Sequence, residues 1–181
     1  MEYGDLCASP ADTLPLQSGG SSCLVAAAAR ILKEKAKMKI MVSACLLGEN
    51  CKYSGGNNRN DALLAALKLH DVIPVCPEVL GGLPVPRTPA EIVNGTVMNR
   101  DGISVDAEFR CGAEKALTIA FREQPEVIIL QSRSPSCGVR EIYDGTFKGK
   151  LVPGEGIFAA MARAAGFHVC DAEEFLSGFY A

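Results

Sequence analysis

The sequence predicts an α/β fold, a doubly wound (Rossmann-like) and mostly parallel sheet with helices on both faces. Strand and helix signals alternate from Lys39 to residue 172. The run EVIILQS, residues 126–132, is apolar and uninterrupted, as in a parallel strand that is covered on both faces. A helical pattern that ends at Gly166 leads directly into another apolar run, FHVCDA. Residues 38–181 are therefore expected to form one α/β domain.

Each element has its own sequence signal. The predicted strands are KIMVSA (39–44), DVIPVC (71–76), EVIILQS (126–132) and FHVCDA (167–172). The predicted helices are 59–70, 106–124 and 153–166, and the first has Asn57, Asn58 or Asn60 as its candidate N-cap. Pro74 inside the second strand is a mild objection, because proline lacks the N–H that a central strand needs. Residues 77–105 are rich in proline and glycine, and a small hairpin is expected around VMNRDGIS.

The first 37 residues differ from the rest in composition. Residues 1–22 are rich in Ser, Gly, Pro and Ala without periodicity, so a flexible leader is expected, followed by an added helix over 23–37. No apolar run approaches the roughly 20 residues of a membrane span. The positive charges of residues 23–39 follow the apolar part, the reverse of a signal peptide. A cytoplasmic location is therefore predicted.

Eight cysteines are many for a chain of 181 residues that has no secretory signal. Because the cytosol keeps thiols reduced, core packing, a catalytic thiol or metal ligation are better explanations than disulfides. Cys45, Cys76 and Cys137 each follow the end of a predicted strand. The carboxyl ends of parallel strands form the crevice in which such folds place their sites. Their separations of 31 and 61 residues match no zinc-ribbon or ferredoxin spacing, so the fold itself must gather them.

The other cysteines have weaker signals. Cys51 lies in the glycine-bearing loop after the first strand and is the strongest rival for a ligand position. Cys111 lies in a predicted helix, where core packing is the simpler explanation, and Cys170 lies near the end of the last strand. His70 and His168 fall at the opposite edge of the sheet, which argues against a Cys–His dyad or a histidine-ligated zinc ion. Sulfur-only ligation suits an iron–sulfur cluster or a thiolate-bound zinc ion.

Three polar residues of the same crevice are candidates for proton chemistry or recognition. Glu78 lies two residues beyond Cys76, although most glutamates in loops are simply solvated. Ser134 precedes Pro135, which holds its backbone extended, although turn formation alone explains a serine there. Arg87 is framed by prolines, with a surface arginine as the default expectation. The segment GGNNRN before a helix gives a weak signal for anion binding.

These motifs together resemble one known family. SACLLG, NCKYSGG, VIPVCPEVLGGLPVPRTPAEIV, SPSCGVREIYDGTFKGKLVPGEG and AAGFHV occur in the order typical of TudS-type thiouracil desulfidases, formerly a domain of unknown function. The match runs from about Met38 to Glu174. The resemblance implies a 4Fe–4S cluster held by only three cysteines, Cys45, Cys76 and Cys137, with one iron not ligated by protein. It implies catalytic roles for Glu78 and Ser134.

Two positions differ from the family pattern. Longer relatives have an apolar residue where Cys51 stands, which lowers its rank as a ligand. Relatives commonly carry a lysine where this chain has Gln131, so the charge near the site differs.

The implied function is non-redox desulfuration of a thiouracil-type base or nucleotide to uracil, with release of hydrosulfide. A soft thiocarbonyl sulfur binds the open iron, which acts as a Lewis acid, while Glu78 and Ser134 activate a water. The iron–sulfur assembly machinery is then an expected partner. Two alternatives are an iron–sulfur sensor or binding module without turnover and a three-thiolate zinc hydrolase. A tRNA substrate ranks lowest, because the net charge is −3 and no basic arm is evident.

Overall fold

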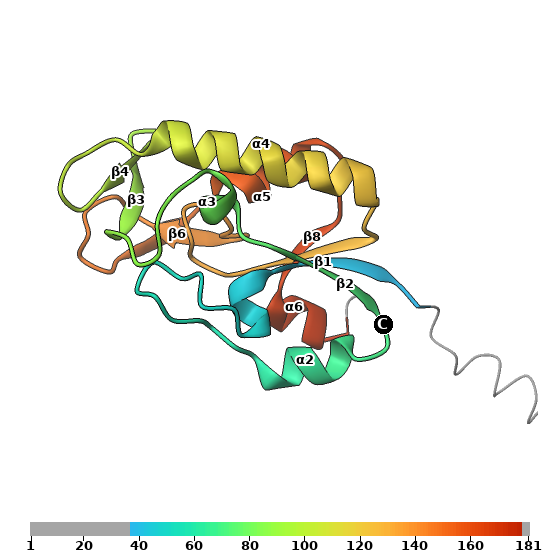
Figure 1. Ribbon diagram of the computed structural model, residues 1–181. Helices are drawn as coiled ribbons and strands as arrows, with labels where there is room; N and C mark the ends of the chain where they lie inside the picture. Colours follow the sequence, from blue (N-terminus) through green and yellow to red (C-terminus); the bar gives the residue numbers. More distant parts are fainter. Residues whose placement is uncertain (1–36, 179–181) are drawn as a thin grey trace, which may run out of the picture. The chain divides into compact units, whose positions relative to one another are not determined.

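Four parallel strands form the central sheet, in the order β2–β1–β5–β8 (Figure 1). The computed structural model describes residues 37–178. The strands are β1 (Lys39–Ser43), β2 (Asp71–Val75), β5 (Val127–Leu130) and β8 (Val169–Asp171). The chain enters at β1, adds β2 on one side, and then adds β5 and β8 on the other. This reversal beside β1 confirms the predicted doubly wound fold and sets the carboxyl ends of β1, β2 and β5 around one crevice.

Helices cover both faces of this sheet (Figure 1). They are η1, a 3₁₀ turn (Ala44–Leu47), α2 (Asp61–Leu67), α3 (Pro77–Leu80), α4 (Asp106–Glu123), α5 (Ile157–Ala164) and α6 (Ala172–Leu176). The long helix α4 and α5 pack on one face, and α2 and α6 pack on the other. Asn60 caps α2, since its Oδ1 accepts a hydrogen bond of 3.0 Å from the Leu63 N–H. Of the three candidate asparagines, the structure therefore selects Asn60.

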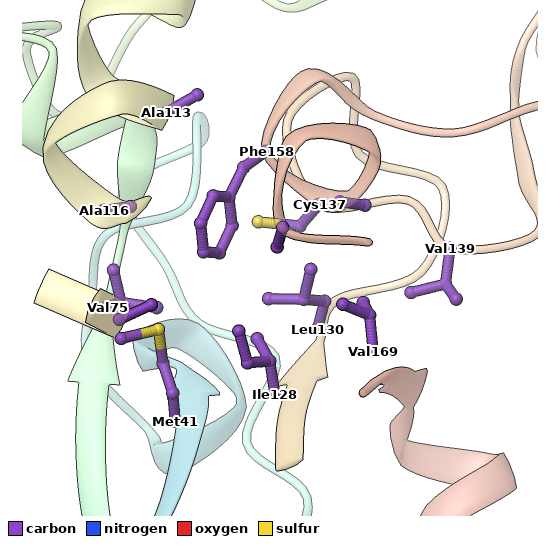
Figure 2. Packing of buried hydrophobic residues seen from close by; sticks show 13 residues of the cluster. Met41, Val75, Ala113, Ala116, Ile128, Leu130, Cys137, Val139, Phe158 and Val169 are labelled. Atoms are coloured by element: carbon purple, nitrogen blue, oxygen red, sulfur yellow. The ribbon is translucent and has the colours of Figure 1, made fainter. Parts of the chain in front are cut away.

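The strand side chains alternate between two hydrophobic clusters. Met41 and Ile128 point to the cluster under α4 and α5, whereas Ile40 and Ile129 point to the cluster under α2 and α6. These four side chains are fully buried. Burying an aliphatic side chain of this size contributes about 1.5–3 kcal/mol, so these clusters hold the helices on the sheet. Cys137 belongs to the first cluster and stands among its labelled side chains in Figure 2.

Pro74 is compatible with β2 because β2 is an edge strand. It pairs only with β1, where Pro74 lies opposite Val42. An edge strand has one side without a neighbouring strand, and proline within sheets is found mainly on such strands. The sequence-based objection to this strand is removed by its place in the sheet.

Two small ribbons lie outside the central sheet. They are formed by β3 (Ala90–Val93) with β4 (Thr96–Asn99) and by β6 (Glu141–Tyr143) with β7 (Leu151–Pro153). The predicted hairpin is displaced along the chain, because the tight turn falls at Asn94-Gly95, where both residues have positive φ. The segment VMNRDGIS closes only a single bridge, between Met98 and Ser104.

One predicted helix begins later than expected. Residues 151–153 form β7, and α5 begins only at Ile157. Gly154 and Gly156 precede it, and glycine favours helix formation less than almost any other residue. The predicted leader and added helix lie outside the described residues, apart from Lys37. Between residues 37 and 178 no helix is both long and apolar enough to cross a membrane.

Candidate active site

A pocket of about 740 Å³ opens at the carboxyl ends of β1, β2 and β5. Four thiols line it, those of Cys45, Cys51, Cys76 and Cys137. The structure thus gathers the three cysteines that sequence placement predicted and adds the rival, Cys51. Other lining residues include Glu78, Arg87, Glu91, Asn58, Gln131 and Ser134.

Cys45 follows β1 directly, in the turn η1. Gly48 ends this turn with φ +100, a conformation that favours glycine, and the chain then reverses toward Cys51. Asn58 returns to the same turn. Its backbone N–H donates to the Cys45 carbonyl at 2.9 Å, and its Nδ2 donates to Cys45 Sγ at 3.8 Å. The GGNNRN segment therefore supplies hydrogen-bond donors to Cys45.

Cys76 lies where β2 passes into α3, and α4 packs against this turn. Gly112 of α4 makes the approach possible, since a Cβ there would lie 1.9 Å from the Pro77 carbonyl oxygen. Gly81, at the other end of α3, is equally tight against the Glu108 carbonyl oxygen of α4, at 2.0 Å. The lack of a side chain at these two glycines thus allows the CPE turn, which carries Cys76 and Glu78, to pack directly against α4.

Cys137 is held by the turn between Ser134 and Gly138. The backbone N–H groups of Ser136 and Cys137 donate to Ser134 Oγ at 3.1 and 3.2 Å, and Gly138 N–H donates to the Ser134 carbonyl at 2.8 Å. The first N–H groups of α5 donate in turn to the carbonyls of Pro135 and Ser136. This satisfies donors that a helix start otherwise leaves free. Cys137 therefore sits in a turn that is held by hydrogen bonds within the turn and from α5.

The Cys51 thiol lies between those of Cys45 and Cys76. A hydrogen bond to Cys45 is the main cause that raises the Cys51 pKa to about 11, with burial adding to it. The Cys76 pKa is raised as well, first by a hydrogen bond to Cys51 and then by burial. Cys76 Sγ also lies 4.0 Å from the Cys51 carbonyl oxygen. The three sulfurs are therefore neighbours, and Cys51 and Cys76 are protonated thiols at neutral pH unless a metal displaces the proton.

Burial raises the Cys137 pKa to about 12, and the charges of Glu78 and Cys76 add to the effect. The hydroxyls of Ser43 and Ser136 act in the opposite direction, because they lie beside the Cys137 thiol. Ser136 Oγ is buried and has no nitrogen or oxygen partner within residues 37–178. A hydroxyl left in this way suits hydrogen bonding to sulfur, whether of a thiolate or of an inorganic sulfide.

Glu78 is the polar centre of the pocket. Its Oε1 accepts a hydrogen bond from Ser134 Oγ at 3.2 Å. Its Oε2 accepts from Arg87 Nε at 2.8 Å and from Arg87 Nη2 at 2.6 Å. The side chains of Glu78 and Arg87 are 16% and 7% exposed. A hydroxyl, a carboxylate and a guanidinium thus form one hydrogen-bonded chain in the pocket that the thiols also line.

The donor set suits an iron–sulfur cluster, in which each cysteine binds a different iron atom. Soft thiols in a largely buried crevice are the ligands that such clusters take.

Two side chains of the pocket were missed or undervalued by sequence reasoning. Arg87 was expected on the surface, yet its guanidinium is nearly buried. Glu91 of β3 was not singled out, yet it is 7% exposed, lines the pocket, and accepts a hydrogen bond from the Phe147 N–H at 3.0 Å. The available signal was the segment PRTPAE, in which prolines flank Arg87 and one of them stands two residues before Glu91, so that the backbone is constrained there.

The remaining predicted positions fall as follows. Cys111 and Cys170 lie outside the pocket, on α4 and on β8. His70 lies at the opposite end of the sheet, where its Nδ1 accepts from the Met38 N–H at 3.2 Å. His168 precedes β8 at the same end, and its carbonyl accepts from Ile128 N–H. Gln131 lines the pocket as a neutral amide and donates to the Ser132 carbonyl at 3.1 Å.

Sequence and structure comparisons identify the proteins to which this chain is similar. The sequence model of the 2-thiouracil desulfurase family matches residues 40–174. An uncharacterised protein of Bacillus subtilis (strain 168), YbbK, is 36% identical over 145 residues, which cover 75% of this chain and 96% of that protein. A solved structure described as the [4Fe-4S]-dependent thiouracil desulfidase TudS is 40% identical, with a TM-score of 0.72 over 78% of this chain and 95% of that one. Because the family model and both similar proteins match most of its length, the chain belongs to the 2-thiouracil desulfurase family.

Proposed function

We propose that this protein is an iron–sulfur-dependent, non-redox desulfidase that converts thiouracil-type bases or nucleotides to uracil and releases hydrosulfide. The family match and the similarity to a [4Fe-4S]-dependent thiouracil desulfidase support this function. The observation that carries it is the pocket itself, which is lined both by Glu78, hydrogen-bonded to Ser134, and by the thiols of Cys45, Cys76 and Cys137.

Cys45, Cys76 and Cys137 are the proposed cluster ligands. Support comes from their common pocket, from the Asn58 amide on Cys45 Sγ, and from the two hydroxyls beside Cys137. With three protein ligands, one iron has no protein donor. When bound, such a cluster supplies a soft Lewis acid for the thiocarbonyl sulfur without net oxidation or reduction.

Glu78 is the proposed general base. Its Oε1 faces Ser134 in the pocket and is in place to take a proton from a water that attacks the ring carbon bearing the sulfur. Ser134 Oγ holds the same carboxylate oxygen and is placed to orient that water or relay its proton. Transfer of a proton from the water to Glu78 makes the water a stronger nucleophile. The sulfur then leaves the ring carbon as hydrosulfide.

The other expectations on partners stay predictions. They are delivery of the cluster by the iron–sulfur assembly machinery, a cytoplasmic location, and the low rank of tRNA as a substrate. The choice between a free base and a nucleotide rests on the same pocket.

The direct experiment adds 4-thiouracil, 2-thiouracil or the monophosphate of 4-thiouridine to protein reconstituted with iron and sulfide without oxygen. The expected result is stoichiometric hydrosulfide and the corresponding uracil product over many turnovers, with the EPR spectrum of the reduced cluster altered on substrate addition. Spectral change without product would favour a sensor or binding module. Tight zinc with no iron in anaerobically purified protein would favour the zinc hydrolase.

A further inference from the structure

Arg87 makes more polar contacts in the pocket than an arginine in a surface loop normally has. Besides its two hydrogen bonds to Glu78, Nη2 donates to the Cys51 carbonyl at 3.0 Å and Nη1 donates to the Pro84 carbonyl at 3.2 Å. Its backbone N–H donates to the Tyr53 carbonyl at 2.7 Å. The guanidinium therefore spans two segments that carry thiols, with only 7% of its side chain exposed.

These contacts give the two oxygens of Glu78 different surroundings. A carboxylate oxygen has about two positions for hydrogen-bond donors. Both positions on Oε2 are taken by Arg87, whereas Oε1 receives one donor, Ser134. A proton or a water can therefore approach Oε1 and is blocked at Oε2. The arginine thus selects which oxygen acts as the base.

The geometry of the guanidinium suits this task in a way that a lysine does not. Its planar fork offers several N–H donors at fixed angles, so one group can hold a carboxylate and two carbonyls at once. A lysine ammonium keeps the charge but lacks the fixed fork. The ion pair lies largely out of water. Loss of the guanidinium would therefore leave a mostly buried carboxylate without its partner, which is unfavourable.

We propose that Arg87 is a positioning residue for Glu78, which fixes the carboxylate so that only Oε1 exchanges protons with the reacting water. The proposal rests on the desulfidase function given above. A purely structural role is the alternative, since Arg87 also holds the Cys51 loop through its carbonyl. The two differ in what a substitution changes, the rate per bound cluster or the amount of cluster bound.

The test uses full-length protein with Arg87→Lys and Arg87→Met. Arg110→Lys is the matched control, because Arg110 Nε pairs with Asp106 Oδ2 at 2.6 Å in an ion pair that lies outside the pocket. Iron and sulfide per chain are measured first, and kcat and KM are then expressed per cluster. Arg87→Met is expected to lower kcat on the order of 10- to 100-fold with little change in KM. Arg87→Lys should recover part of this loss, and Arg110→Lys should match the unmodified protein.

A double substitution completes the test. If Arg87 acts through Glu78, then Arg87→Met should change kcat by less than about twofold once Glu78→Gln is present, because the two effects are not additive. Unchanged kcat per cluster in Arg87→Met, with or without loss of iron, would overturn the positioning role. Additive losses in the double variant would overturn it too. Unmodified protein that holds a full cluster but releases no sulfide would instead overturn the desulfidase function, and the role of Arg87 with it.

Discussion

The Ser134 hydroxyl donates to Glu78 Oε1 at 3.2 Å, and the direction of this hydrogen bond is set by the turn around Ser134. Two backbone N–H groups, of Ser136 and Cys137, already donate to Ser134 Oγ. The oxygen has two acceptor positions and one proton, so the proton is left for the carboxylate. The turn that presents Cys137 therefore also orients the serine toward the proposed base.

Removal of either partner should lower kcat while the cluster stays bound. Glu78→Gln keeps the shape of the side chain but cannot accept the proton, and Ser134→Ala removes the hydroxyl. We expect kcat to fall about 10²- to 10⁴-fold in Glu78→Gln, the range that general-base catalysis contributes. In Ser134→Ala, kcat should fall by a smaller factor. Anaerobic sulfide release with iron content measured on the same sample checks this.

Glu114→Gln is the control for charge, because Glu114 is exposed on α4 and lies outside the pocket. It should be as active as the unmodified protein. Normal sulfide release by Glu78→Gln with full iron would remove the proposed base. Loss of iron from Ser134→Ala would mean that the hydroxyl acts chiefly by holding the Cys137 turn.

Substitution of the proposed cluster ligands should remove iron. Cys45→Ser, Cys76→Ser and Cys137→Ser each take a soft donor from the pocket, and an alcohol binds iron far more weakly than a thiolate does. Each variant should hold well under half of the iron of the unmodified protein after anaerobic reconstitution. Iron analysis and the visible absorption of the cluster measure this directly.

Cys111→Ser is the control for these substitutions, and Cys51→Ser tests whether Cys51 is a cluster ligand. Cys111 lies on α4 away from the pocket, so its substitution should leave iron unchanged. Cys51→Ser should also keep the cluster, because three other thiols remain. If Cys51→Ser loses iron and one of the three proposed ligands can be replaced without loss, the ligand set includes Cys51 instead.

The cluster-free protein should show unusually slow thiol chemistry in this pocket. The pKa values of Cys51 and Cys137, about 11 and 12, lie above the ordinary 9.0 of a thiol, so both are neutral at pH 8. Because the thiolate is the reactive form, iodoacetamide should label both more slowly in folded protein than in urea. The rate at Cys51 should keep rising with pH up to about 11. Mass spectrometry of the peptides reads each site, and equal rates in folded and unfolded protein would contradict the burial described here.

Much of the fold could be predicted from local pattern. The burial of the run VIIL in β5 and of residues 40–43 in β1 follows from uninterrupted apolar runs, as in a parallel strand covered on both faces. The placement of the three cysteines at strand ends was enough to predict a common crevice, because topology brings those ends together. The late start of α5 was not predicted, since a Pro-Gly-Glu-Gly segment reads equally well as a helix start or as the end of a ribbon.

The tertiary contacts of the site were beyond local pattern. Nothing in the sequence fixes which of two cysteines, Cys45 or Cys76, the thiol of Cys51 contacts, and the fold brings it to both. The burial of Arg87 also depends on a carboxylate nine residues away and on a loop that returns from Cys51. Such contacts depend on how loops pack, and a single sequence carries that information only weakly.

The approach of α4 to the CPE turn gives a prediction whose sign opposes the general rule. Gly→Ala within a helix normally stabilises a protein by roughly 0.5–1 kcal/mol. Gly112→Ala should instead destabilise, because its Cβ would lie 1.9 Å from the backbone oxygen of Pro77, which cannot turn away as a side chain can. Overpacking of this kind costs about 1–3 kcal/mol. Urea denaturation of the cluster-free protein measures the change.

The same substitution should also disturb the candidate active site, because the displaced segment carries Cys76 and Glu78. We expect Gly112→Ala to bind less iron and to have a lower kcat per remaining cluster, since α3 can relieve the overlap only by moving away from α4. Glu114→Ala, two residues further along α4 and exposed, is the control and should change neither iron content nor kcat. A Gly112→Ala protein that is more stable than the unmodified chain and fully loaded with iron would show that α3 does not rest on α4 in solution.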